Sequence, residues 1–303
     1  MLSIAAELQR GWAVSLSDYE GMHGHLAAAE EPGYMTLDGI RAAEQFAPLG
    51  LGKSTKVALW GYSGGGLATG WAAEMYSGYA PELNVVGTAM GGPPSDVRAL
   101  LASNGTASAG LIGLGLSSLA NAYPDFGAAL SAHLTPEGAA EMQKIRSQCG
   151  FRNFAEQTFT DYNKYLNIPI SQFIELPPVK TTFDATTLGA NAPAMPLYVY
   201  QAVFDEMVPV ATTDRMVEQY CAAGTSVTYK RDHASEHGSL ALTGMYDAID
   251  WLAQRLDTDM PKPAGCSTQN VLTTAAEPGV PQSMLDAAKA AIDLGLGLPI
   301  GPN

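Results

Sequence analysis

A serine surrounded by glycines occupies the motif Gly61-Tyr62-Ser63-Gly64-Gly65, between an apolar run at 56–60 and a stretch of helical spacing. The pattern G-x-S-x-G is weak alone, but between a strand and a helix it is typical of a tight turn that exposes a nucleophilic serine. Glycines relieve crowding in such a turn, and four are present: Gly61, Gly64, Gly65 and Gly66. We predict Ser63 as nucleophile and the N–H of Gly64 as oxyanion donor. The alternative is a turn that only packs a helix on a strand.

A serine hydroxyl is a weak nucleophile, so it needs a base that is held by an acid. Asp205 follows the apolar run 197–203, at the end of a predicted strand where open parallel sheets collect functional groups. Its neighbour Glu206 is the rival acid, but it should point the other way. His237 lies in a loop between a short predicted strand and a helix, where the base is expected. The other histidines are competitors, with His233 the nearest in sequence: His23, His25, His133 and His233.

Other chemistry has less support in this sequence. No H-E-x-x-H motif or convergent His/Asp cluster predicts a metal, and the glycine motif lacks the register of a dinucleotide site, so we expect no cofactor. The net charge is -14, from 16 Lys and Arg against 30 Asp and Glu, which disfavours nucleic acid as a partner. No apolar run approaches the roughly 18 residues of a membrane span, so no integral membrane segment is predicted.

Three cysteines, Cys149, Cys221 and Cys266, are too few for a disulfide scaffold and lack zinc-site spacing. Our hypothesis is one disulfide between Cys221 and Cys266, with Cys149 left unpaired; three unpaired thiols are the alternative.

The elements that must position these residues alternate along the chain. Strands are predicted at 12–17, 56–60, 83–90, 197–203 and 226–231, and helices at 36–46, from the serine motif to about 76, at 212–223 and at 240–256. This alternation predicts an α/β fold with a mostly parallel sheet flanked by helices.

The alternation stops between 95 and 193. We predict helical pieces there near 96–120, 126–132 and 136–148, followed by loop-rich sequence with three prolines. The predicted organisation is therefore a core from 1–94 and 194–260, an inserted helical cap at 95–193, and a C-terminal tail at 261–303 packed on the surface of the core. A plain helical insertion is the alternative to a mobile lid.

Several stretches resemble the secretory lipases related to yeast lipase A, which have the α/β-hydrolase fold. The stretches are SDYEG (17–21), LDGIRA (37–42), the long run 56–94 with APELN and its closing GGPP, FDEMVP (204–209) and EHG (236–238). The resemblance implies a lipase or carboxylesterase that cleaves carboxylic esters, with Ser63, Asp205 and His237 as its triad. It implies an ester or acylglycerol substrate, transient contact with a lipid interface, and an acyl chain bound by the cap. Tyr62, Asp18 and Tyr19, within two of these stretches, are predicted to contact substrate.

The resemblance also implies an N-terminal portion that this sequence does not show. Family members have further strands and a loop that donates a second oxyanion N–H, whereas Met1 stands just before the predicted strand 12–17. We expect a fragment, a late-start gene model or a trimmed variant, with an open sheet edge. Secretion is expected from the family, although residues 1–14 do not form a signal peptide. The alternative functions are a non-catalytic binding protein of this fold and a truncated, weakly active fragment.

Overall fold

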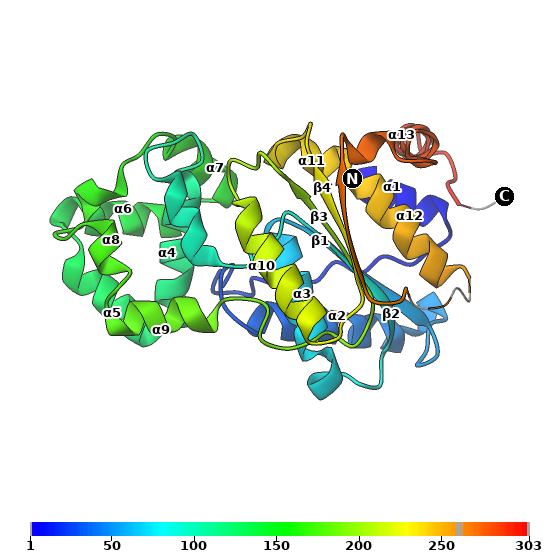
Figure 1. Cartoon of the computed structure of the whole chain (residues 1–303), viewed down its shortest axis with the longest axis horizontal. Helices are drawn as coiled ribbons and strands as arrows, with labels where there is room; N and C mark the ends of the chain where they lie inside the picture. The colour runs from blue at the N-terminus through cyan, green and yellow to red at the C-terminus, as the bar shows by residue number, and fades with distance from the viewer. Residues whose placement is uncertain (1, 259–260, 262, 302–303) are drawn as a thin grey trace.

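The computed structural model describes residues 2–258, 261 and 263–301, and a parallel sheet lies at its centre (Figure 1). Its five strands lie side by side in sequence order: β1 (Lys56–Tyr62), β2 (Asn84–Gly91), β3 (Leu197–Ala202), β4 (Val227–Asp232) and β5 (Cys266–Val271). Every neighbouring pair is parallel. All six residues of β3 are buried, as expected for the middle strand of a sheet covered on both faces. The predicted α/β class is confirmed.

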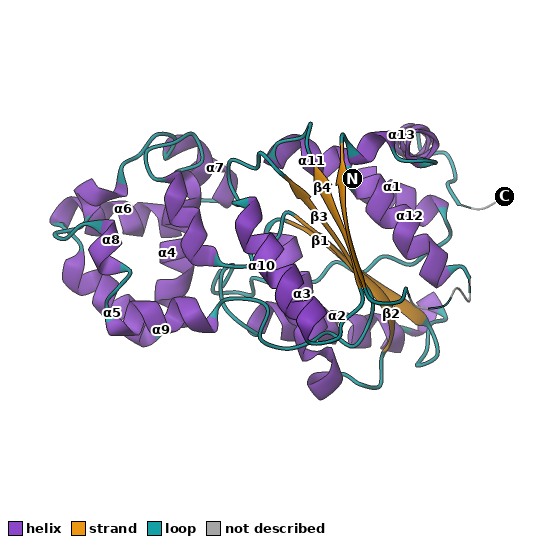
Figure 2. Cartoon of the chain, in the orientation of Figure 1, coloured by secondary structure: helices purple, strands orange, loops and turns teal. Residues whose placement is uncertain are grey.

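Helices cover both faces of the sheet (Figures 1 and 2). One face carries α2 (Glu31–Gln45), α3 (Gly64–Tyr79) and α10 (Val210–Ala222), and the short helix η1 (Ala47–Leu49) follows α2. The other carries α1 (Leu2–Gln9), α11 (His237–Thr243), α12 (Met245–Leu256) and α13 (Val280–Gly295). In α12, buried Ala248 and Leu252 join the apolar cluster of Ala89 and Tyr198 on the sheet. The spacing of these two residues places them on one side of the helix, which therefore docks on the sheet.

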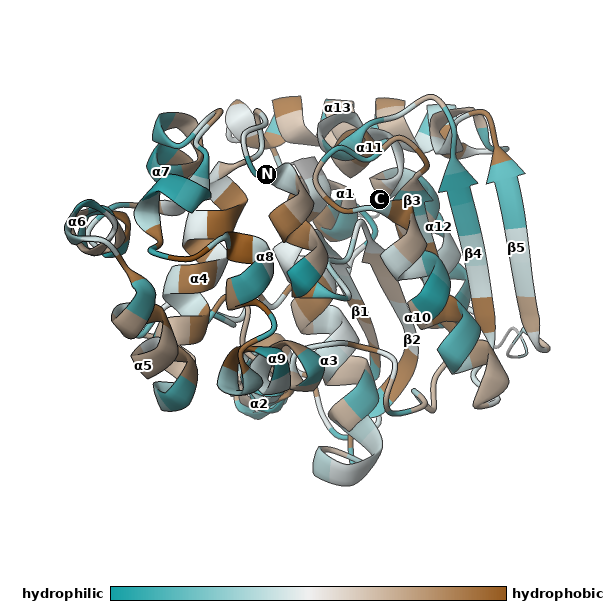
Figure 3. Cartoon of the chain, turned by 60° about the vertical axis from the view of Figure 1, so that its left-hand side comes forward, coloured by the Kyte–Doolittle hydropathy of each residue, from teal (hydrophilic) through white to brown (hydrophobic). Residues whose placement is uncertain are grey.

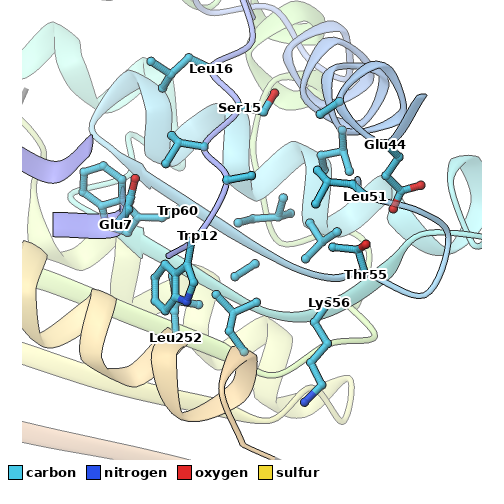
Figure 4. A pocket seen from close by; sticks show the side chains of 18 of the residues that line it. Glu7, Trp12, Ser15, Leu16, Glu44, Leu51, Thr55, Lys56, Trp60 and Leu252 are labelled. Atoms are coloured by element: carbon cyan, nitrogen blue, oxygen red, sulfur yellow. The ribbon is translucent and has the colours of Figure 1, made fainter. Parts of the chain in front are cut away.

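The predicted strand at 12–17 is wrong. These residues pair with no strand that the structure describes, and β1 lies at the end of the sheet. A groove of about 420 Å³ is lined by 11–17 on one side and 55–60 on the other (Figure 4). The alternation of Trp12, Val14 and Leu16 indicates extended backbone, but alternation cannot tell whether a neighbouring strand is present.

The region 95–193 is helical, as expected for its first half. Its elements are η2 (Val97–Ser103), α4 (Gly110–Ala122), α5 (Pro124–His133), α6 (Pro136–Arg146), α7 (Gly150–Glu156), η3 (Tyr162–Tyr165), α8 (Ile170–Phe173) and α9 (Pro177–Ala185). The stretch predicted to be loop-rich contains the last four. Pro177 occupies the first turn of α9, where proline initiates a helix instead of breaking it. One apolar cluster includes Phe126 and Phe173 of this region together with Leu67 and Trp71 of α3. The insertion therefore packs continuously with the core.

The C-terminal tail contains two elements that the sequence did not reveal, β5 and α13. The first five residues of β5 are exposed, and the strand is polar over most of its length (Figure 3). It lies at the edge of the sheet, so it lacks the apolar run by which buried strands are found. The short helix η4 (Thr274–Ala276) follows it.

The predicted disulfide is confirmed. A disulfide joins Cys221 of α10 to Cys266 of β5, and Cys149 is an exposed free thiol. No helix among the described residues is long and apolar enough to cross a membrane.

Candidate active site

The turn that carries Ser63 joins β1 to α3 and is held in a strained conformation. Ser63 has φ 54° and ψ -120°, and its N–H donates to the carbonyl of Gly91 at 2.8 Å. Non-glycine residues rarely adopt a positive φ, and such strain is found mainly at functional sites. A Cβ on Gly61 would lie 2.1 Å from the carbonyl oxygen of Gly65, so only glycine fits at that position.

The other glycines of the motif are not equally constrained. A Cβ on Gly66 would lie 2.9 Å from the Gly91 carbonyl, and one on Gly64 3.1 Å from Leu26. At Gly65 no atom lies within 4 Å of that position. The expected crowding is therefore present at Gly61 and Gly66 and absent at Gly65.

Ser63, His237 and Asp205 form a line of hydrogen bonds. The Nε2 atom of His237 lies 3.0 Å from Ser63 Oγ, and its Nδ1 lies 2.7 Å from Asp205 Oδ2. An ionised carboxylate can only accept, so Nδ1–H donates to Asp205 and the Nε2 lone pair faces the serine hydroxyl. The side chains of His237 and Asp205 are 7% and 0% exposed, which shields both from water. This arrangement can withdraw the proton from Ser63.

The carboxylate of Asp205 is held by hydrogen bonds from several directions. Its Oδ1 accepts from the N–H groups of Met207 and Val208 at 2.9 and 2.7 Å. Its Oδ2 accepts from Nε2 of Gln201 at 2.7 Å, in addition to the bond from His237. Two main-chain amides, one side-chain amide and one imidazole therefore fix both oxygens. Gln201 is a residue that sequence reasoning missed.

The rival acid and the rival base lie elsewhere. The carboxylate of Glu206 accepts from the main-chain N–H of His237 at 3.1 Å, so it supports the histidine without touching its ring. His233 is bonded to Asn270 at 3.1 Å. His25 is paired with Glu31 and His133 with Asn167. Of the five histidines, His237 is the one whose ring is hydrogen-bonded to Ser63 in the described structure.

Two acidic side chains, those of Asp232 and Glu236, stabilise the turn that leads to His237. Burial alone would raise the pKa of Asp232, but hydrogen bonds from Thr274, Ala234 and Ser235 lower it below its usual value. Glu236 caps α11 by accepting from the N–H groups of Gly238 and Ser239. Hydrogen bonds from Ser239 hold the pKa of Glu236 below its usual value. Both carboxylates therefore stay ionised and keep the turn in one conformation.

Tyr62 and Gly92 pack directly against the histidine. The hydroxyl of Tyr62 donates to the carbonyl of His237 at 2.5 Å, and the two ring centres lie 5.1 Å apart. Gly92 has φ 50°, and a Cβ there would lie 3.1 Å from Cε1 of His237. Tyr62, predicted to contact substrate, thus has its hydroxyl engaged by the main chain of the base. The two consecutive glycines at the end of β2, Gly91 and Gly92, were the available signal for the close approach at Gly92.

Tyr19 lies beside the start of α3, whereas Asp18 does not take part in the line of hydrogen bonds. A Cβ on Gly64 would lie 3.2 Å from the hydroxyl of Tyr19. Burial, reinforced by the charges of Glu20 and Asp18, raises the pKa of Tyr19 to about 12. The phenol therefore keeps its proton at neutral pH and can donate a hydrogen bond next to the predicted oxyanion position. Asp18 is exposed, and its main-chain carbonyl accepts from Gly21.

Two cavities in the described structure lie away from the serine. The groove of about 420 Å³ follows β1 and is lined by none of the three residues in the hydrogen-bonded line. A second cavity, of about 20 Å³, lies inside the insertion among apolar residues of η2, α4 and α9. Binding of an acyl chain there would require those helices to separate, since the space holds little more than one water.

The sequence and the fold of this chain resemble those of known proteins. The sequence model of the family "Secretory lipase" matches residues 1–263. The chain is 38% identical over 256 residues to "Probable inactive lipase MT1628" of Mycobacterium tuberculosis, covering 84% of this chain and 57% of that protein. It is 35% identical over 309 residues to "Lipase A" of Arthroderma benhamiae, covering 100% of this chain and 65% of that protein. The chain thus spans less than two thirds of the length of these two relatives.

The fold has a solved counterpart. The crystal structure of Candida antarctica lipase A superimposes with a TM-score of 0.86 at 29% sequence identity, over 99% of this chain and 73% of that one. A family match over most of the chain and a structural match over nearly all of it lead to one conclusion: this chain belongs to the secretory lipase family and has the α/β-hydrolase fold.

Proposed function

We propose that the chain is a serine hydrolase that cleaves carboxylic esters, as a lipase or carboxylesterase, through an acyl-enzyme on Ser63. The observation that carries the proposal is the unbroken line Ser63–His237–Asp205, with bonds of 3.0 and 2.7 Å. Relatives of this chain include secreted triacylglycerol lipases of Malassezia globosa and a trichothecene C-3 esterase of Fusarium sporotrichioides, which supports esters as the substrate class.

The reaction follows from the direction of each hydrogen bond. His237 takes the proton of Ser63 through Nε2 as Oγ attacks the ester carbonyl, and the carboxylate of Asp205 stabilises the resulting imidazolium. The imidazolium then protonates the departing alcohol, which leaves an acyl group on Ser63. Water attacks this acyl-enzyme by the same steps, and the acid is released with Ser63 restored.

Charge on the carbonyl oxygen develops next to the start of α3. The first N–H groups of a helix have no partner within the helix, so the N–H of Gly64 is available as an oxyanion donor. The hydroxyl of Tyr19 would lie 3.2 Å from a Cβ on Gly64, which supports Tyr19 as one of the three predicted substrate contacts. Loss of one oxyanion donor typically lowers kcat by roughly 100- to 1,000-fold, so both groups are worth testing.

The region 95–193 is proposed as a cap over the site, with acyl chains held among its leucines. Support comes from its contacts with the loop after residue 17: Ala27 donates to Ser118 of α4 at 2.9 Å, and Ala29 to Tyr123 at 2.8 Å. The cap is thereby attached to the segment that carries Tyr19. Transient contact with a lipid interface and secretion are proposed with it, since the matched family is secretory and two relatives are secreted lipases.

The second candidate is a non-catalytic protein of this fold, which binds an ester without turnover. The observation in its favour is the word "inactive" in the name of the M. tuberculosis relative, which is 38% identical. The observation against it is that nucleophile, base and acid are all present here and hydrogen-bonded. A weakly active fragment is the intermediate case.

A fluorophosphonate probe distinguishes these functions, because it reacts with an activated serine and not with an ordinary one. We expect stoichiometric labelling of the folded chain, localised to Ser63 by mass spectrometry and abolished in Ser63→Ala. Turnover of a p-nitrophenyl ester, with little turnover of the matched anilide, identifies an esterase. Labelling without turnover identifies a binding protein or an incomplete enzyme. A folded chain that takes no label contradicts the proposed triad.

A further inference from the structure

Two buried polar side chains extend the line of hydrogen bonds beyond Asp205. The hydroxyl of Thr213, on α10, donates to Oε1 of Gln201 at 3.0 Å. The Nε2 group of Gln201, on β3, donates to Asp205 Oδ2 at 2.7 Å and to the carbonyl of Val208 at 3.1 Å. Gln201 and Thr213 are both 0% exposed. The mechanism above assigns neither of them a role.

The orientation of the Gln201 amide follows from its neighbours. Its Nε2 end faces a carboxylate oxygen and a main-chain carbonyl, and both of these groups can only accept hydrogen bonds. The opposite end must then be the carbonyl oxygen, and the hydroxyl of Thr213 gives it a donor. Only in this orientation do both Nε2 and Oε1 of Gln201 have hydrogen-bond partners. A buried polar group costs free energy when it is not hydrogen-bonded, so the alternative orientation is disfavoured.

We propose that Gln201 is a positioning residue for the triad acid and that Thr213 fixes its direction. This inference rests on the proposed function, since it assigns a role in the same reaction. Gln201 and His237 both donate to Oδ2 of Asp205, so Gln201 holds that oxygen in line with Nδ1 of His237. It also ties Asp205 to Val208 in the same loop. The amide is a neutral donor, whereas a cation in the same place would weaken the attraction between Asp205 and the imidazolium.

The experiment compares Gln201→Met, which keeps the length and loses the donor, with Gln201→Glu, which replaces the donor by a carboxylate. The control is Thr225→Val. Thr225 is also a buried side chain that donates a hydrogen bond, to the carbonyl of Pro193 at 2.9 Å, but it precedes β4, at the opposite end of that strand from the site. Rates are normalised to the sites titrated with fluorophosphonate after long incubation. The measured quantities are kcat, KM and the pH dependence of kcat/KM for a p-nitrophenyl ester.

Gln201→Met is expected to lower kcat by about 10- to 100-fold with KM changed little, because a hydrogen bond to a charged group is lost. The acidic limb of kcat/KM should move to higher pH. Without the amide dipole the carboxylate attracts the imidazolium more strongly, so His237 keeps its proton to a higher pH. Gln201→Glu should move this limb further in the same direction. Thr225→Val should leave kcat per titrated site and the pH profile unchanged.

Thr213 gives an independent test in case Gln201→Met does not fold. Thr213→Val removes the hydroxyl at constant shape, and a smaller fall in kcat with the same direction of pH shift is expected. Thr213→Ser keeps the donor and should restore the wild-type profile. Values of kcat and pH profile in both the Gln201 and Thr213→Val variants equal to wild type would overturn the inference. Absence of label in the wild-type chain would instead remove the proposed function on which it rests.

Discussion

The carboxyl ends of the strands and the free side of β1 are built in opposite ways. At the carboxyl ends the buried polar groups around Asp205 and Asp232 are satisfied by hydrogen bonds within the chain. Along the free side of β1, a groove of about 420 Å³ separates the strand from residues 11–17. There the buried Oε1 of Glu44 has no hydrogen-bond partner, and burial raises the pKa of Glu7 to about 7.

The difference teaches that the line of hydrogen bonds at the site does not involve the free side of β1. Ser63, Asp205 and His237 follow β1, β3 and β4, and the ladders among β1, β2, β3 and β4 fix those strands relative to one another. None of these ladders uses the free side of β1. We therefore expect changes at the carboxyl ends to affect activity strongly and changes in the groove to affect mainly stability and association.

The largest effect should follow from removing a member of the hydrogen-bonded line. Ser63→Ala or His237→Ala is expected to lower kcat by about 10⁶-fold, and Asp205→Asn by about 10⁴-fold, while the melting temperature stays close to wild type. Hydrolysis of a p-nitrophenyl ester measures this. Ser77→Ala, at an exposed serine of α3, is the control and should retain full activity. Activity in Ser63→Ala comparable with wild type would show that catalysis occurs elsewhere.

The turn at the tip of β1 should be the next most sensitive position. Gly61→Ala places a Cβ 2.1 Å from a main-chain oxygen, so we expect a loss of stability of at least about 1–3 kcal/mol and slow phosphonate labelling. Gly65→Ala meets no atom within 4 Å and should change the unfolding free energy by less than about 1 kcal/mol. Urea unfolding compares the two variants. Equal destabilisation by both would show that the turn is less tight than described.

In the groove, Glu7 should make stability depend on pH. Its pKa is raised from 4.5 to about 7 by burial, so the folded chain holds a proton that the unfolded chain releases. Its favourable contribution is complete below about pH 4.5 and is lost as pH rises through about 7. Relative to Glu7→Gln, the wild type should therefore lose on the order of 1–3 kcal/mol of unfolding free energy between pH 5 and 8.

The matched control for this prediction is Glu137→Gln, at an exposed position of α6. Its stability should follow that of the wild type at both pH values. Parallel curves for wild type and Glu7→Gln would mean that Glu7 is solvated in the groove.

The smallest effect is expected at Leu16, which lines the groove and is 77% exposed. Leu16→Lys places a charge beside an unpaired sheet edge, a device that natural proteins use against edge-to-edge association. We expect less self-association in sedimentation, a change in unfolding free energy within about 0.5 kcal/mol, and unchanged labelling of Ser63. Loss of labelling would show that a change in the groove alters the site, and it would contradict the independence of the two regions.

The three residues of the hydrogen-bonded line are easier to predict from the sequence than their surroundings, for physical reasons. Ser63, Asp205 and His237 could be placed because each follows a strand with a recognisable local pattern. Gln201 could not be predicted as part of the site, because a single amide in an apolar strand carries no local pattern. Its role becomes visible only when its neighbours in space are known. The polar strand β5 was not predicted, and the unpaired stretch 12–17 was predicted as a strand. Both errors arise because strand pairing is a long-range property. Alternation reports only on local backbone and burial.

The disulfide between Cys221 and Cys266 has a consequence for His237. The two cysteines are 45 residues apart, and the covalent ring they close includes β4, the proposed base and α12. Just outside the ring, Thr274 donates to Asp232 at the turn that leads to that base. In an oxidising compartment the ring restricts the unfolded chain, by about 4 kcal/mol in the loop-entropy account. Where thiols are kept reduced, hydrogen bonds and packing alone would hold this part of the chain, so the redox state of the surroundings would bear on the proposed base.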